Sequence, residues 1–260
     1  MKRNHYILIT IVITLCIHTS CSRQVPAETA PPKTSPAAFA AAISEADSLF
    51  RQRADVSKLK QAIDVLAKVR VPGDRNFEVE WKFAEYSYFL GGKMTDENES
   101  KKTYESGRDA GSNASSMEPA KPDGYFWYGA NLGELSRLNP LTVGVKSIDD
   151  LKGSMNKVIE IQPGYQNSSA YDALAQIEMD SRMFGGTPDK AIELLEKALQ
   201  TEKNNMDMRI HLAEAYLAVK RDRDARSQLE QALQMRPNPE YLPEYNESLE
   251  EARKMLKTKF

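Results

Sequence analysis

The sequence predicts an all-α fold, a solenoid of about five helix-turn-helix repeats with a C-terminal capping helix. The main observation is residues 206–239, where two amphipathic helical patterns flank a polar turn and a proline follows the second. The second half of this unit recurs 34 residues (225 − 191) earlier, with Ala191, Leu195 and Ala198 preceding Ala225, Leu229 and Ala232. Small residues let two helices cross closely, and large ones fill the space between crossings. A tandem match at a fixed period therefore indicates a stacked repeat architecture.

The order of large and small residues in this unit carries a family resemblance. Counted from Met206, the residues at positions 7, 8, 11, 20, 24, 27 and 32 are Leu212, Ala213, Tyr216, Ala225, Leu229, Ala232 and Pro237. In this pattern the segment resembles the tetratricopeptide repeat (TPR) superfamily. The resemblance implies that the first helix of each repeat lines an inner surface through positions 2, 5, 9, 12 and 13, while positions 4, 7, 8 and 11 pack.

The first half of the chain fits the pattern with longer turns. Repeat one begins at Ala37, and its packing residues are Ala46, Leu49, Phe50, Ala62, Leu66 and Val69. In repeat two we expect Gly91 and Gly92 to end the first helix, the second helix to cover 96–112, and 111–124 to form a long surface loop.

The remaining repeats follow in order. The third begins with the aromatic run 125–128 and carries an insertion at 139–145. The fourth begins near Tyr171 and has a widened turn, after which we expect Thr187 to cap a helix that starts at Pro188. The polar amphipathic segment 243–259 is expected to cover the end of the stack.

The N-terminal segment resembles a bacterial lipoprotein signal. Basic residues precede the apolar run 6–17, and small residues precede Cys21. We therefore expect a signal peptide at 1–20, a lipid on Cys21, a proline-rich tether at 21–36 and a helical domain at 37–260. His18 departs from the usual pattern, which leaves an ordinary signal cleaved near Ser20 as the alternative; Cys16 is less suited, because bulky Leu15 precedes it.

This lipoprotein-type signal predicts that the protein is anchored to a bacterial membrane and faces the periplasm. Ser22 after the acylated cysteine favours the outer membrane slightly. The membrane is expected to be contacted through the lipid alone.

Composition argues against several classes of function. The formal charge of −2 provides no basic face for nucleic acid. With 1–20 removed, the chain keeps one cysteine and one histidine, Cys21 and His211, too few for a disulfide framework or a Cys/His zinc cluster. We expect no catalytic residues, metal or cofactor, because no nucleophile, base and orienting group can be assembled. His211 itself is expected to be a surface residue.

A narrower resemblance rests on the Trp127 helix, the segment 159–165, the Gly185-Gly186 turn and the closing helix with Asn246, Ala252 and Leu256. These features look like the TatT family of lipoproteins associated with tripartite ATP-independent periplasmic (TRAP) transporters. The resemblance implies an apolar channel or groove, homo-oligomers and a transporter substrate-binding protein as partner. The regulator of microtubule dynamics group is a weaker match, and the lipoprotein-like start argues against it.

The inner-face positions of repeats two and three supply the candidate binding residues, which are Tyr86, Phe89, Trp127, Asn131, Glu134 and Arg137. Aromatic side chains with few charges suit an apolar ligand or a peptide segment. Trp127, Tyr86 and Phe89 fit the interior of the stack equally well, and Asn131 fits a solvated helix surface. The alternative function is a TPR scaffold lipoprotein that recruits proteins to a cell-envelope assembly and holds no small ligand.

Overall fold

The computed structural model describes residues 33–237, 239 and 242–260. The predicted signal peptide, Cys21 and residues 21–32 of the predicted tether lie outside the described residues. The chain divides into a unit at 1–33 and a compact unit at 34–260, and the fold below is that of the second unit.

The compact unit is all-α. Its helices are α1 (Pro36–Phe50), α2 (Val56–Val69), α3 (Phe77–Lys93), α4 (Glu97–Met117), α5 (Asp123–Leu138), α6 (Val145–Ile161), α7 (Ser169–Asp180), α8 (Pro188–Thr201), α9 (Met206–Ala218), α10 (Asp222–Ala232) and α11 (Leu242–Lys259), with a π-helical turn η1 (Pro140–Gly144) and a 3₁₀ turn η2 (Arg182–Phe184). No strand occurs among the described residues, where an isolated bridge joins Val71 and Asp74.

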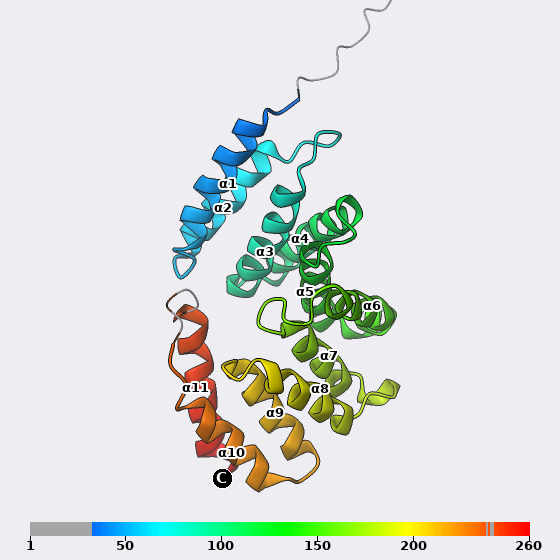
Figure 1. Cartoon of the computed structure of the whole chain (residues 1–260), viewed down its shortest axis with the longest axis vertical. Helices are drawn as coiled ribbons and strands as arrows, with labels where there is room; N and C mark the ends of the chain where they lie inside the picture. Colours follow the sequence, from blue (N-terminus) through cyan, green and yellow to red (C-terminus); the bar gives the residue numbers. More distant parts are fainter. Residues whose placement is uncertain (1–32, 238, 240–241) are drawn as a thin grey trace, which may run out of the picture. The chain divides into compact units, whose positions relative to one another are not determined.

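Successive helices pack as antiparallel pairs, and each pair packs on the next (Figure 1). The pairs are α1/α2, α3/α4, α5/α6, α7/α8 and α9/α10, and α11 packs on α9 and α10. This arrangement confirms the predicted TPR-like solenoid with its capping helix. None of the helices described is long and apolar enough to cross a bilayer.

Side-chain caps define where many helices begin. Thr187 accepts a hydrogen bond from the Lys190 backbone N–H, and Pro188 opens α8, as predicted. The same role is played by Ser35, Asp55, Asn76, Asp96 and Asn205 at α1, α2, α3, α4 and α9. Each cap satisfies a backbone donor that the first helical turn leaves without an internal partner.

Alternating small and large residues form the core, as the repeat pattern predicts. Ala225, Leu229 and Ala232 are fully buried, and Ala191, Leu195 and Ala198 of the preceding repeat are at most 1% exposed. The buried residues group into one cluster within residues 39–174 and another within 171–255. Hydrophobic burial between neighbouring pairs therefore holds the stack together.

The expectation that Gly91 and Gly92 end a helix is wrong, because α3 continues to Lys93. A Cβ at Gly91 would lie 2.5 Å from Cε1 of Tyr104, so glycine is needed here for close packing of α4 against α3. Ser100 strengthens the contact by donating to the Gly91 carbonyl at 2.8 Å.

The predicted loop at 111–124 is also wrong over its first half, since α4 runs to Met117. Gly111 lies against α5, where a Cβ would meet the Tyr128 backbone nitrogen at 2.5 Å. Packing against α5 thus offsets the low helix propensity of glycine in α4. The insertion predicted at 139–145 folds as η1, and α10 ends at Ala232, before the proline expected to stop it.

Candidate functional site

The aromatic candidates belong to the core of the first three repeats. Tyr86 is 1% exposed; its ring stacks on Phe50 with centroids 4.1 Å apart, and its hydroxyl donates to Asp47. Trp127 is 4% exposed, and its ring contacts Phe126 edge-on at 4.9 Å. Phe89 is half-buried between Phe50 and Trp127. These rings pack against one another and leave little aromatic surface for a ligand.

Asn131 is fully buried, so the expectation that it fits a solvated helix surface is wrong. Its Nδ2 donates to the carbonyls of Ala84 at 2.9 Å and Trp127 at 2.7 Å, which joins α5 to α3. Its Oδ1 has no hydrogen-bond partner among the described residues. Asn131 therefore fixes the distance between two helices.

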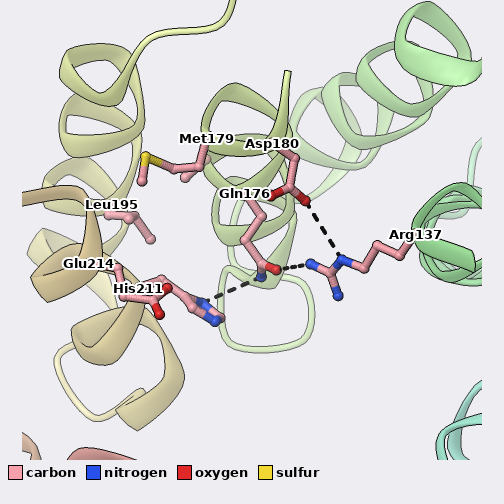
Figure 2. A pocket seen from close by; sticks show the side chains of 8 residues that line it. Arg137, Gln176, Met179, Asp180, Leu195, His211 and Glu214 are labelled. Atoms are coloured by element: carbon pink, nitrogen blue, oxygen red, sulfur yellow. Dashed lines mark hydrogen bonds and ion pairs between the residues drawn. The ribbon is translucent and has the colours of Figure 1, made fainter. Parts of the chain in front are cut away.

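Glu134 and Arg137 are the candidates that reach a pocket. Arg137 lies on α5 and donates through Nη1 to Glu134 Oε1 at 2.8 Å. Its Nη2 donates to Gln176 on α7, and its Nε lies 3.7 Å from Asp180 Oδ2 (Figure 2). Arg137 thus bridges two successive first helices, and its side chain remains 49% exposed.

His211 and Glu214 of α9 form the opposite wall of this pocket (Figure 2). The imidazole Nδ1 lies 2.7 Å from Asp172 Oδ1, and Gln176 Nε2 lies 3.2 Å from Asp172 Oδ2. Asp172 is buried, and its two carboxylate oxygens contact the side chains of His211 and Gln176. His211 is therefore a half-buried, ion-paired residue and not the surface histidine that the sequence suggested.

The charge state of His211 follows from these neighbours. Burial works to lower the pKa of His211, but the charge and hydrogen bond of Asp172 outweigh burial and raise the pKa from 6.5 to about 9. The imidazole is therefore protonated near neutral pH, with Nδ1–H donating to Asp172.

The pocket has a volume of about 280 Å³. Its apolar lining residues are Ala175 and Met179 of α7 and Leu195 of α8. Ligand pockets for drug-sized molecules occupy about 300–1,000 Å³. This pocket is therefore sized for a single side chain or a similarly small group.

Glu214 differs from the other charged residues of the pocket. Its side chain is exposed and forms no hydrogen bond or ion pair within the part of the chain that the structure describes. Burial of the carboxyl raises its pKa, protonated His211 lowers it, and the carboxylates Glu251, Asp180 and Asp172 raise it again. Glu214 is thus an unpaired carboxylate near the carboxylates of Glu251, Asp180 and Asp172.

Repeat-position counting could have found most of this pocket. With Tyr171, Leu174 and Ala175 at positions 4, 7 and 8 of repeat four, positions 5, 9, 12 and 13 are Asp172, Gln176, Met179 and Asp180. These four either line the pocket or hold its walls. The inner-face positions do not indicate His211, at position 6 of repeat five, nor the apolar lining residues Ala175 and Leu195.

A family comparison matches half of the chain. Residues 42–171 match the model of the family described as regulator of microtubule dynamics protein 1-3. The chain belongs to this family. From the sequence this family is a weaker resemblance than TatT, and the match corrects that expectation. The lipoprotein-like residues 1–21 lie outside the matched region.

In this member of the regulator of microtubule dynamics family, residues 185–242 match a second model, the tetratricopeptide repeat. Among solved structures, the TPR protein TTC0263 of Thermus thermophilus matches with a TM-score of 0.57 at 17% identity, covering 81% of this chain and 98% of that one. PilF of Pseudomonas aeruginosa also matches with a TM-score of 0.57, at 13% identity, covering 86% and 92%. These likenesses show the TPR fold. No curated protein sequence matches the chain.

Proposed function

We propose that this chain is a protein-binding scaffold, which presents the inner face of its TPR solenoid to a partner polypeptide and performs no catalysis. The observation that carries the proposal is the pocket formed by Arg137, Gln176, His211 and Glu214, which come from three successive first helices. Side chains on successive helices can contact consecutive residues of an extended segment, and TPR superhelices use such surfaces for recognition.

The aromatic core favours the scaffold over an apolar channel. A channel past Trp127 would require its ring to line a cavity, whereas Trp127 packs against Phe126, Tyr88 and Phe89. The polar pocket lies further along the stack, where Arg137, Asp180 and Glu214 are exposed. We therefore place protein recognition there.

We further propose that a lipid on Cys21 anchors the scaffold to a bacterial membrane, with the helical unit in the periplasm. The basic start, the apolar run 6–17 and the small residues before Cys21 support this. Radiolabelled palmitate should be incorporated by the wild-type chain and not by Cys21→Ser. Equal labelling of the two would exclude Cys21, and absence of label would favour the ordinary signal cleaved near Ser20.

More narrowly, the partner of this chain is a substrate-binding protein of a TRAP-type transporter, and the chain also binds an apolar ligand. This TRAP hypothesis rests on the TatT-like features of the sequence alone. Microtubules, which the family description names, belong to the relatives behind that description; the lipoprotein-like start of this chain supports a partner in the cell envelope instead.

Site-specific photocrosslinking in cells tests the scaffold. A photoreactive residue at Asp180 or Ala218, exposed on the first helices α7 and α9, should yield a discrete protein adduct. The same residue at Glu193 or Arg223, exposed on the second helices α8 and α10, provides the matched control. Adducts confined to the control positions, or absent from all four, would contradict the proposal. Mass spectrometry of the adduct tests the TRAP hypothesis, because only a crosslinked TRAP substrate-binding protein would support it.

A further inference from the structure

The cations around the pocket already have anionic partners. Arg137 donates to Glu134 at 2.8 Å and His211 to Asp172 at 2.7 Å. Each of these pairs is neutral overall. What remains is the carboxylate of Asp180, 67% exposed and 3.7 Å from Arg137, and the unpaired carboxylate of Glu214. The pocket therefore carries a surplus of negative charge at its mouth.

Part of the lining of the same pocket is apolar. Ala175, Met179 and Leu195 are lining residues, as are the acids Asp180 of α7 and Glu214 of α9 (Figure 2). A group that fits both parts must have a hydrocarbon stem and a cationic end. Lysine and arginine side chains have this form, since their methylene stems cover apolar surface while the charged head remains near water.

We infer that the pocket between α5, α7, α8 and α9 receives one lysine or arginine side chain of the partner polypeptide, with Glu214 and Asp180 binding its charged end. This inference rests on the proposed scaffold function and names the chemistry of the segment that the scaffold recognises.

Two features argue against other occupants. An anion would meet a net negative charge, because the four carboxylates of Glu134, Asp172, Asp180 and Glu214 outnumber the two cations Arg137 and His211. A neutral apolar group would contact Ala175, Met179 and Leu195 but would leave the surplus negative charge of the pocket without a counter-charge. The crowding of Glu251, Asp180 and Asp172 around Glu214 would be relieved by a bound cation.

Binding of synthetic peptides to the full chain in detergent tests the inference. The probe is a blocked heptapeptide with one central lysine among glycine, serine and alanine, and the comparison peptides carry norleucine or glutamate at that position. Calorimetry gives the affinity, and the methyl resonance of Met179, assigned with Met179→Leu, reports whether the pocket is occupied. We expect the lysine peptide to shift this resonance and to bind about tenfold more tightly than the norleucine peptide.

Variants locate the binding charge. Glu214→Gln should weaken the lysine peptide about tenfold while leaving the norleucine peptide unchanged. Because Glu214 is exposed and unpaired among the described residues, the substitution should not disturb folding. Glu193→Gln, an exposed neutralisation on α8, removes the same charge away from the pocket and should leave both affinities unchanged.

The outcomes separate the inference from the scaffold proposal. Equal binding of lysine and norleucine peptides, preference for glutamate, or an unaffected Glu214→Gln variant would each overturn the inference. Crosslinking from Asp180 and Ala218 to a partner would remain intact in those cases if the scaffold proposal is right. If instead the peptide binds as inferred and no position crosslinks in cells, the scaffold proposal fails.

Discussion

Arg53 and Glu244 form a two-pronged ion pair between residues 191 positions apart in the sequence. Arg53 follows α1, and its Nε and Nη2 each lie 2.8 Å from a carboxylate oxygen of Glu244 in the first turn of α11. The Arg53 side chain is 4% exposed, and its guanidinium also lies 4.9 Å from the centroid of the Phe50 ring. In a repeat stack most contacts join neighbouring repeats, so this pair adds a contact between the first repeat and the capping helix.

Replacing Glu244 with glutamine should destabilise the protein. The change leaves the buried guanidinium without its carboxylate, and loss of charged hydrogen bonds costs about 1.5–3 kcal/mol. Chemical denaturation should show this loss, and hydrogen exchange should show faster opening of α11. Glu250→Gln is the control, because its pair with Arg253 is 73% and 56% exposed and should contribute about 0–1 kcal/mol. Equal stability of the two variants would mean that the Arg53 contact does not hold α11.

Replacing Gly111 with alanine should destabilise the chain although α4 is helical there. Alanine is about 1 kcal/mol better than glycine in a helix interior. At this position, however, the added Cβ would meet the backbone nitrogen of Tyr128 at 2.5 Å and its Cα at 2.7 Å. Backbone atoms cannot move aside without shifting α5, and overpacking of this kind typically costs about 1–3 kcal/mol.

Gly153 in α6 provides the matched control for Gly111. A Cβ at Gly153 would have nothing within 4 Å, and the residue lies in the helix interior. Gly153→Ala should therefore stabilise the protein by about 0.5–1 kcal/mol. Opposite signs in thermal unfolding would establish that the α4–α5 contact requires glycine. A stabilising effect of Gly111→Ala would contradict that packing.

The repeat register could be read from sequence because it depends on local spacing of small and large residues. Ala191, Leu195 and Ala198 identify the core face of α8 at a fixed distance from the same residues of α10. Such a pattern records only how each helix meets its sequence neighbours. The pattern therefore predicts which helices pair, but it does not predict where α4 ends.

The site was harder to predict because burial on the inner face depends on contacts outside each repeat. Position 9 is occupied by Tyr86 in repeat two and by Gln176 in repeat four, yet Phe50 of α1 covers Tyr86, whereas Gln176 lines the pocket. Asn131 is buried because Gly107 of α4 leaves room for it, and a Cβ on Gly107 would clash with its Oδ1. No spacing rule reports such close approaches.

Glu178 should contribute to acid-dependent stability. It is buried on α7, and its Oε1 lies 2.7 Å from Lys152 Nζ and 3.2 Å from Lys190 Nζ. Burial works to raise the pKa of Glu178, but hydrogen bonds from these lysines and their charges leave it lowered. Stability from a depressed carboxyl pKa is present above the unfolded value of 4.5 and is lost as pH falls through the folded value.

The test is Glu178→Gln, which should lower the free energy of unfolding near pH 7 by about 1.5–3 kcal/mol. The difference in free energy of unfolding between this variant and the wild type should shrink as pH falls below 4.5. Glu160→Gln, in an exposed pair with Lys157, should change stability by about 0–1 kcal/mol at every pH. A deficit of Glu178→Gln that does not depend on pH would show that the charge of Glu178 is not the source of its stabilisation.

His211 should stabilise the fold at neutral pH and lose this effect in alkali. The pKa of His211 is raised to about 9, above the unfolded value of 6.5, so its contribution is complete below 6.5 and disappears as pH rises through about 9. Thermal unfolding should show His211→Asn to be less stable than wild type at pH 6, with the difference shrinking as pH rises from 6.5 to about 9. Glu85, whose pKa burial raises to about 8, titrates in the same window, but it is present in both proteins and cancels in the difference. In an Asp172→Asn background the effect of His211→Asn should depend much less on pH, because the carboxylate that raises the pKa of His211 most is gone. An unchanged pH dependence would show that Asp172 is not its source.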